Sequence, residues 1–76
     1  MITVKLYGLL RLDSGIKERQ LEASTVSQVL NYLESLGIPR NSLNSAVILV
    51  NGKNANKRSK LTDGDTVVLM SPVAGG

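Results

Sequence analysis

The residues best placed to do chemistry are the last two, Gly75 and Gly76. They end a segment, Ser71 to Gly76, that continues a strand poorly because Pro72 has no N–H group and glycine resists order. Six extended residues reach roughly 20 Å, enough to place the terminal carboxylate in a pocket of another protein. Two glycines can also thread a channel that side chains would block. We expect a functional tail; the alternatives are a frayed terminus or residues left by cloning.

The rest of the chemical inventory is small. The 76 residues include no cysteine, histidine, tryptophan or phenylalanine. This composition excludes disulfides, thiolate or imidazole metal sites, and Ser-His or Cys-His catalysis. The six acidic residues are scattered, so we expect no metal site. One small core leaves little room for an enclosed active site, so the chain is expected not to be an enzyme itself.

Charge and hydropathy limit the partners. Nine Lys and Arg against six acidic residues give a formal net charge of +3. Single-strand binders usually add stacking aromatics to a basic cluster, and here Tyr7 and Tyr32 are far from it in sequence, so we expect a solvated loop or a contact with an acidic partner surface, and no nucleic acid. No apolar run could span a bilayer and no signal peptide is evident, which predicts a complete, cytoplasmic protein without a membrane partner. The cluster comprises Lys53, Lys57, Arg58 and Lys60.

The elements that must position the tail follow from periodicity. Apolar and polar residues alternate from Ile2 to Leu6, which predicts a half-buried strand. Gly8 and the Asp13-Ser14-Gly15 cluster predict a turn, and the charged residues 17–22 predict a short edge strand.

A helix is predicted next, because apolar residues recur at the spacing of one helical face. Thr25 and Gln28 form a capping-box pattern at its start, and Gly37 with Pro39 ends it. Residues 40–45 are polar and predict a surface linker. The apolar face comprises Val26, Val29, Leu30, Leu33 and Leu36.

Two further strands are predicted, at residues 46–50 before a tight Asn51-Gly52 turn and at Thr66 to Met70. The predicted order of elements is strand, strand, helix, strand, strand, and this order favours an α+β β-grasp fold. In such a fold a mixed sheet of four to five strands carries one main helix on one face, and the first and last strands are adjacent in the middle of the sheet. We expect a domain at 1–70 and an extended, flexible tail at 71–76.

The last two strands are apolar on both faces. If Ile48 and Val50, with Val67 and Leu69, face the helix, the intervening residues face away from it. Scattered surface hydrophobes are the alternative. We expect instead one contiguous patch that binds a partner protein. We call Val47, Leu49, Val68 and Met70 the outer patch.

Three segments of the sequence, at residues 50–52, 61–67 and 72–76, resemble the MoaD/ThiS family of ubiquitin-like sulfur carriers. The resemblance covers the whole chain. The length and the ending are more similar to the MoaD branch, the small subunits of molybdopterin synthase, in which a second proline often stands at the position of Ser71. The three segments are Val50-Asn51-Gly52, Leu61-Thr62-Asp63-Gly64-Asp65-Thr66-Val67 and Pro72-Val73-Ala74-Gly75-Gly76.

The resemblance implies that Gly76 is the reacting residue. Its carboxylate is a poor electrophile, so a MoeB-like adenylating enzyme would activate it with ATP before a separate donor supplies sulfur, giving a thiocarboxylate. The chain would bind no cofactor itself. Gly75 would allow passage through a channel, Pro72 would stiffen the departure from the sheet, and Val73 and Ala74 would contact the channel wall.

The resemblance also implies partners. The thiocarboxylate would enter the MoaE-like large subunit of molybdopterin synthase and give sulfur to a pyranopterin during molybdenum cofactor biosynthesis. The outer patch would dock the activating enzyme and the synthase in turn. Two alternatives stay open: conjugation of Gly76 to proteins, as in a ubiquitin-like modifier, and delivery of sulfur to thiamine or a tungsten-pterin.

Overall fold

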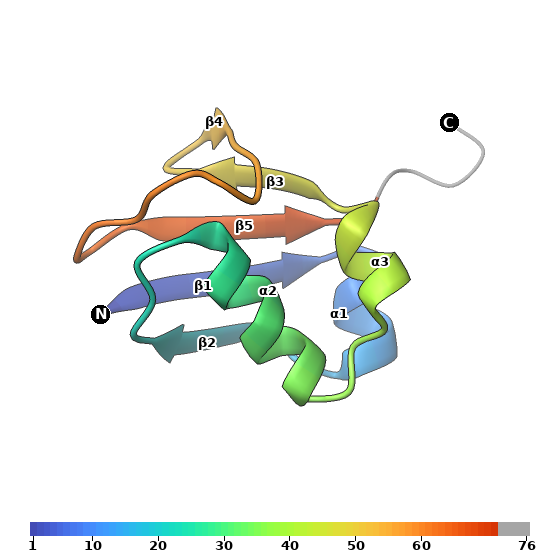
Figure 1. The fold of residues 1–76 in the computed structure, drawn as a ribbon. Helices are drawn as coiled ribbons and strands as arrows, with labels where there is room; N and C mark the ends of the chain where they lie inside the picture. The colour runs from blue at the N-terminus through green and yellow to red at the C-terminus, as the bar shows by residue number, and fades with distance from the viewer. Residues whose placement is uncertain (72–76) are drawn as a thin grey trace.

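The computed structural model describes residues 1–71, within which the chain forms one five-stranded sheet and three helices (Figure 1). The predicted tail residues 72–76 lie outside the described residues. In chain order the elements are β1 (Ile2–Tyr7), α1 (Leu9–Ser14), β2 (Glu18–Leu21), α2 (Val26–Ser35), α3 (Arg40–Asn44), β3 (Val47–Val50), β4 (Lys53–Asn54) and β5 (Thr66–Met70).

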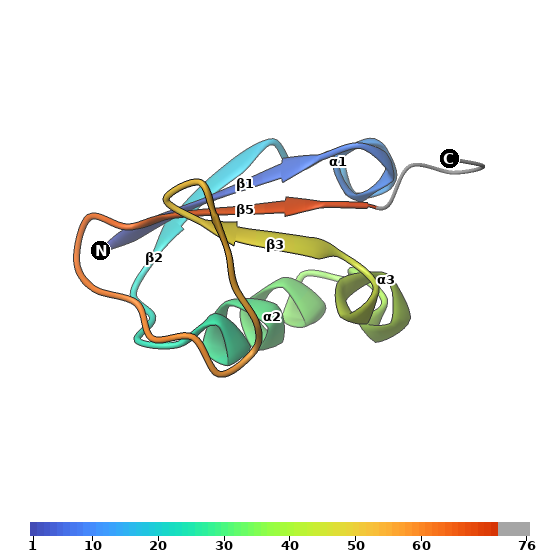
Figure 2. The ribbon, with the colours of Figure 1, turned by 90° about the horizontal axis from the view of Figure 1, so that it is seen from above.

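The sheet has the strand order β2-β1-β5-β3-β4. The first and last strands of the chain, β1 and β5, pair in parallel at its centre, and the other pairs are antiparallel. Figure 2 shows α2 and α3 together beneath one face of this sheet. The mixed sheet with its main helix on one face is the predicted ubiquitin-like β-grasp.

The core lies between the sheet and α2. The predicted helical face is confirmed at Val26, Val29, Leu30 and Leu33, which are fully buried. The prediction is wrong for the fifth residue, Leu36: it caps the end of α2 and is 43% exposed, because the helix ends one residue before it. From the sheet side, the alternating residues of β1 and β5 meet this face, because successive side chains of a strand point to opposite sides. They are Ile2, Val4, Leu6, Val67 and Leu69.

Two predictions of irregular structure are wrong. The segment expected as a turn contains α1, and the expected surface linker at 40–45 contains α3. Each helix is anchored by one buried leucine, Leu10 in α1 and Leu43 in α3. A helix of five or six residues is too short to show a 3.6-residue repeat, so tertiary burial rather than periodicity determines it.

The start of α2 is closed by side chains and by a distant loop. Thr25 Oγ1 accepts a hydrogen bond from the Gln28 N–H at 3.3 Å, while Gln28 Oε1 accepts one from the Ser24 N–H at 2.7 Å. The capping pair is therefore present, but its second bond goes to the residue before Thr25. Val26 N also donates to the Ser59 carbonyl at 3.0 Å, so the basic loop packs against this end of the helix.

The Asp63-Gly64-Asp65 turn is tied to the β3–β4 hairpin. Asp65 accepts hydrogen bonds from the Thr62 N–H and from Asn51 Nδ2, both at 2.9 Å. These bonds, that from Thr62 first, lower the pKa of the Asp65 carboxyl below its ordinary value. Asn51 in turn accepts from the Thr66 N–H at 3.0 Å, so one cluster fixes the start of β5.

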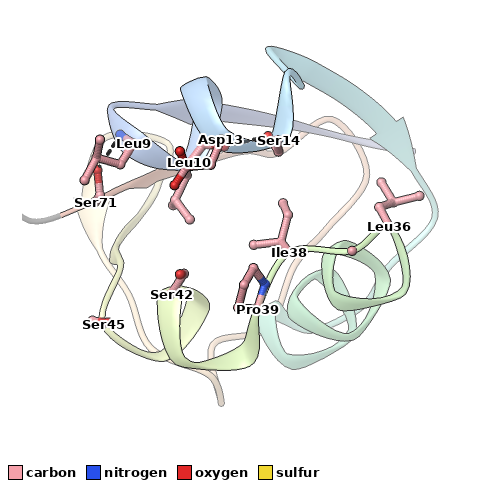
Figure 3. A pocket seen from close by; sticks show the side chains of 11 residues that line it. Leu9, Leu10, Asp13, Ser14, Leu36, Ile38, Pro39, Ser42, Ser45 and Ser71 are labelled. Atoms are coloured by element: carbon pink, nitrogen blue, oxygen red, sulfur yellow. Dashed lines mark hydrogen bonds between the residues drawn. The ribbon is translucent and has the colours of Figure 1, made fainter.

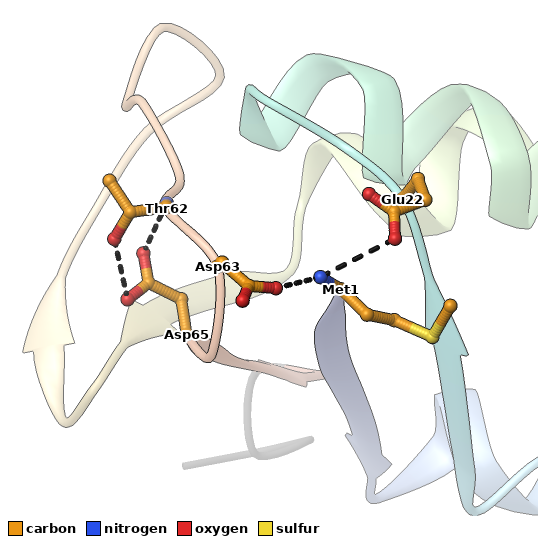
Figure 4. A network of polar contacts seen from close by, with 5 residues as sticks. All are labelled: Met1, Glu22, Thr62, Asp63 and Asp65. Carbon is orange, nitrogen blue, oxygen red and sulfur yellow. Dashed lines mark hydrogen bonds and ion pairs between the residues drawn. The ribbon is translucent and has the colours of Figure 1, made fainter.

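The beginning of β1 meets the same turn (Figure 4). The Met1 amino group contacts the carboxylates of Asp63 and Glu22, while the Met1 carbonyl accepts a hydrogen bond from the Gly64 N–H at 2.9 Å. The hydrogen bond that the Met1 amino group donates to Asp63 raises the pKa of the amino group above its ordinary value. Both central strands are therefore held at one end by side chains of the 62–65 turn.

The division at residue 70 stays a prediction, since most of the segment beyond it is outside the described residues. Among residues 1–71 no helix is long and apolar enough to cross a bilayer.

Candidate functional site

The outer patch is brought together by the pairing of β3 and β5. In this antiparallel register Val47 lies opposite Met70, and Leu49 lies opposite Val68. The alternate residues of β5, Val67 and Leu69, are buried against the helices. The four predicted residues therefore point away from α2 and form two adjacent cross-strand pairs, as the alternation predicted.

The outer patch extends onto β1 by one residue that sequence reasoning left out. Tyr7 pairs with Met70 and is 41% exposed, close to the 40% of Val47. The other three patch residues are half-buried, because neighbouring side chains on the sheet shield one another. Tyr7 lies on the outer side of the alternating strand β1, but the parallel pairing of β1 with β5 is a tertiary fact.

Polar residues border the outer patch on both sides. Lys5 of β1 lies beside Val68 of β5, and Glu18 of the edge strand β2 lies opposite Lys5. On the other side, Asn54 of β4 lies opposite Leu49. An apolar centre with a polar rim is the usual anatomy of a protein–protein contact surface.

The tail departs from the end of a central strand. Ser71 follows β5 directly and is the last described residue, so the predicted roles of Pro72 to Gly76 fall outside the described residues. Ser71 Oγ accepts a hydrogen bond from the Leu9 N–H at 2.8 Å, as Figure 3 shows. The reactive carboxylate proposed for Gly76 is thus five residues from a point that α1 holds.

A cavity of about 660 Å³ lies between α1 and the segment that joins α2 to α3 (Figure 3). Leucines 9, 10 and 36 with Ile38 and Pro39 form its apolar wall. Asp13 is its one ionisable lining residue among those described, so the cavity has no acid–base pair. Residues 1–71 likewise hold no group of three or more candidate metal ligands.

The basic residues of the 53–60 stretch are all exposed. Lys53 belongs to β4, while Lys57, Arg58 and Lys60 lie in the loop that reaches the start of α2. The solvated loop predicted for all four is present for these three, whereas Lys53 lies in a short strand because it pairs with Val50. That they bind no nucleic acid stays a prediction.

Comparison with known proteins identifies a family whose model matches almost the whole chain. The ThiS family model matches residues 4–76, which include both terminal glycines. A sequence search of curated proteins finds no match.

Solved structures share the fold over nearly the whole chain. Small archaeal modifier protein 1 from Methanosarcina acetivorans is 28% identical, with a TM-score of 0.79 over 99% of this chain and 95% of that chain. CysO in the Amycolatopsis orientalis BexX/CysO complex is 25% identical, with a TM-score of 0.76 and full coverage of both chains. The Helicobacter pylori complex of molybdopterin-converting factor subunits 1 and 2 shows the fold alone at 22% identity, with a TM-score of 0.75 over 99% and 97%.

The resemblance seen in the three sequence segments is therefore confirmed at the level of the family. The match extends through the Asp-Gly-Asp turn to the last residue, and the fold on which it lies is the one shared by these structures. The chain belongs to the ThiS family, a group of small ubiquitin-like proteins of the ThiS/MoaD type.

Proposed function

We propose that this protein is a sulfur carrier that reacts through the carboxylate of Gly76. The observation that carries the proposal is the family match through Gly75 and Gly76, on a fold whose outer patch is left uncovered by α2 and α3. In this proposal a partner enzyme supplies both the ATP site and the groups that activate the carboxylate.

The chemistry needs two steps. The Gly76 carboxylate attacks the α-phosphate of ATP, which forms an acyl-adenylate and releases pyrophosphate. Hydrosulfide then attacks the acyl carbon and displaces AMP, which leaves a thiocarboxylate and releases one proton. The chain has no cysteine, so the sulfur comes from outside and no thiol of the carrier competes for its own activated carbonyl.

Two partners follow from this cycle. A MoeB-like adenylating enzyme activates the tail, and a MoaE-like subunit of molybdopterin synthase receives the thiocarboxylate for molybdenum cofactor biosynthesis. The Helicobacter pylori complex of subunits 1 and 2 is a structure in which a protein of this fold is paired with a second subunit, which supports a protein partner. The outer patch binds each partner in turn, so the two contacts exclude each other.

A second function has its own support. Small archaeal modifier protein 1 is 28% identical over almost the whole chain, which favours conjugation of Gly76 to a lysine of another protein. An amine then displaces AMP in place of hydrosulfide. Delivery of sulfur to thiamine or to a tungsten-pterin uses the same thiocarboxylate and differs only in the acceptor.

Intact mass spectrometry tests the proposal. The chain is incubated with ATP, sulfide and the adenylating enzyme of its host, and we expect a gain equal to one sulfur replacing one oxygen. Deletion of Gly76 should abolish the gain in mass. Deletion of Gly37 would not be a suitable control, because that residue lies at the end of α2. The wild-type chain incubated without ATP is the control and should keep its mass.

Two results contradict the sulfur carrier. An unchanged mass, with the enzyme shown to be active on another carrier, removes the proposal. A ladder of larger covalent species that depends on Gly76, without the thiocarboxylate, replaces it with the modifier.

A further inference from the structure

The last described residue is linked to an element far away in the sequence. The Leu9 N–H donates to Ser71 Oγ at 2.8 Å, across 62 residues of chain. The parallel pairing of β1 and β5 ends with Tyr7 beside Met70, so the two strands leave the sheet together. β1 continues into α1 at the point where β5 reaches Ser71.

Gly8 makes this contact possible. Its φ of 67° and ψ of −143° belong to a region that residues with a Cβ rarely adopt. A Cβ built on Gly8 would also lie 2.5 Å from Ser71 Oγ, closer than real Cβ atoms approach an oxygen. The glycine therefore meets a conformational need of the β1–α1 turn and leaves space for the serine hydroxyl.

The backbone of Ser71 is restricted as well. A residue before a proline is disfavoured in the helical region because the pyrrolidine ring would clash with it, and Pro72 follows. The side chain is held by α1 through the Leu9 N–H. Side chain and backbone are thus constrained at the one residue that joins β5 to the tail.

We propose that Ser71 is a positioning residue, whose hydrogen bond to the start of α1 sets the direction in which the chain leaves β5 and so presents the Gly76 carboxylate to the activating enzyme. This inference rests on the proposed function of Gly76. With only five residues between the anchor and the carboxylate, a fixed direction of departure removes part of the ordering cost that binding would otherwise incur.

The hydrogen bond exists in the free carrier, and five residues of sequence follow Ser71 before the chain ends. Its loss raises the KM for the carrier, because more tail conformations must be excluded on binding. The kcat of adenylation stays the same, since the bound carboxylate meets the same groups. The expected rise in KM is roughly two- to tenfold, the range that one net hydrogen bond sustains.

A matched pair of substitutions tests the acceptor. Ser71→Thr keeps the hydroxyl, whereas Ser71→Val has nearly the same shape without it. We expect Ser71→Val to raise KM in the pyrophosphate-release assay with the host adenylating enzyme and Ser71→Thr to retain the wild-type value. Amide hydrogen exchange of Leu9, measured on the free carrier by NMR, should quicken in the valine variant alone.

The donor can be removed independently. Leu9 is the first residue of α1, a position that tolerates proline because its N–H makes no bond within the helix. Leu9→Pro therefore deletes the donor, and Leu9→Ala, which keeps it, controls for the lost side chain. We expect Leu9→Pro to raise KM as Ser71→Val does, and the double variant to be no worse than either single one.

The outcomes separate this inference from the proposed function. No thiocarboxylate or adenylate on the wild-type chain refutes the sulfur carrier itself. A wild-type chain that reacts, with a KM unchanged in both Ser71→Val and Leu9→Pro, refutes the positioning role alone. Equal losses in Ser71→Thr and Ser71→Val, or additive losses in the double variant, refute it as well.

Discussion

The two faces of the sheet use the same strands for different purposes. On β5, Val67 and Leu69 are fully buried against the helices, while Val68 and Met70, which alternate with them, are half-buried on the outer face. The residue types are nearly the same on both sides. Hydrophobicity alone therefore does not distinguish core residues from residues of a contact surface. A residue belongs to the core when it lies on the face of the sheet that α2 covers.

The largest expected effect is on the covered face. Leu69→Ala should lower the free energy of unfolding by about 2–5 kcal/mol, because it leaves a cavity beside α2. Leu49→Ala, the same substitution on the outer face, should cost about 1 kcal/mol or less. Urea unfolding followed by circular dichroism measures both. Similar losses for the two variants would remove the distinction between the faces.

The outer face should respond in binding instead. We expect Met70→Arg to weaken affinity for the adenylating enzyme tenfold or more, about 1.4 kcal/mol, because a charge would enter an apolar contact. Its stability should change little. Isothermal titration calorimetry measures the affinity, and Thr3→Arg, which adds the same charge on the same face outside the outer patch, is the control. Strong destabilisation with unchanged binding would place Met70 in the core.

The helix that makes one face the core can be weakened at its start. Thr25→Ala should cost about 1 kcal/mol, since the Gln28 N–H loses its side-chain acceptor. Thr25→Ser keeps the acceptor and should behave as the wild type in thermal unfolding. Partner affinity of the folded protein should be unchanged in both variants, because α2 lies on the opposite face from the outer patch. A fall in affinity with Thr25→Ala would show that the two faces are coupled.

The smallest effect concerns the turn that fixes β5 for both faces. The pKa of Asp65 is lowered in the folded protein, so folding favours its ionised form. The resulting stabilisation is present above the unfolded pKa, near pH 4, and is lost as the pH falls through the folded value. Unfolding measured between neutral and acidic pH should show a shallower dependence in Asp65→Asn than in the wild type. An equal dependence on pH in the two proteins would contradict this prediction.

Much of the fold could be predicted because its patterns repeat within short windows. α2 shows a full helical face from Val26 to Leu33, and β1 alternates over its whole length. The Asn51-Gly52 pair was also informative, since both residues adopt positive φ in the turn before β4. Each signal needs only local spacing or the conformational freedom of one residue type.

The short helices could not be predicted in this way. α3 has one buried residue, Leu43, and neighbours that favour turns equally well. α1 has Gly8 before it and Gly15 after it, the latter in the left-handed conformation typical of a helix end, and these two glycines are the signal that could have found it. One turn of helix costs as much to nucleate as a long one, so packing decides whether it forms.

By itself, the sequence determined which residues of each strand share a face and where the main helix begins and ends. Only the tertiary structure decided which of the two apolar faces is covered, that Tyr7 lies beside Met70, and that Ser71 meets Leu9. The reason is physical: periodicity acts between near neighbours, whereas these contacts join residues more than 60 positions apart, which only the parallel pairing of β1 and β5 brings together.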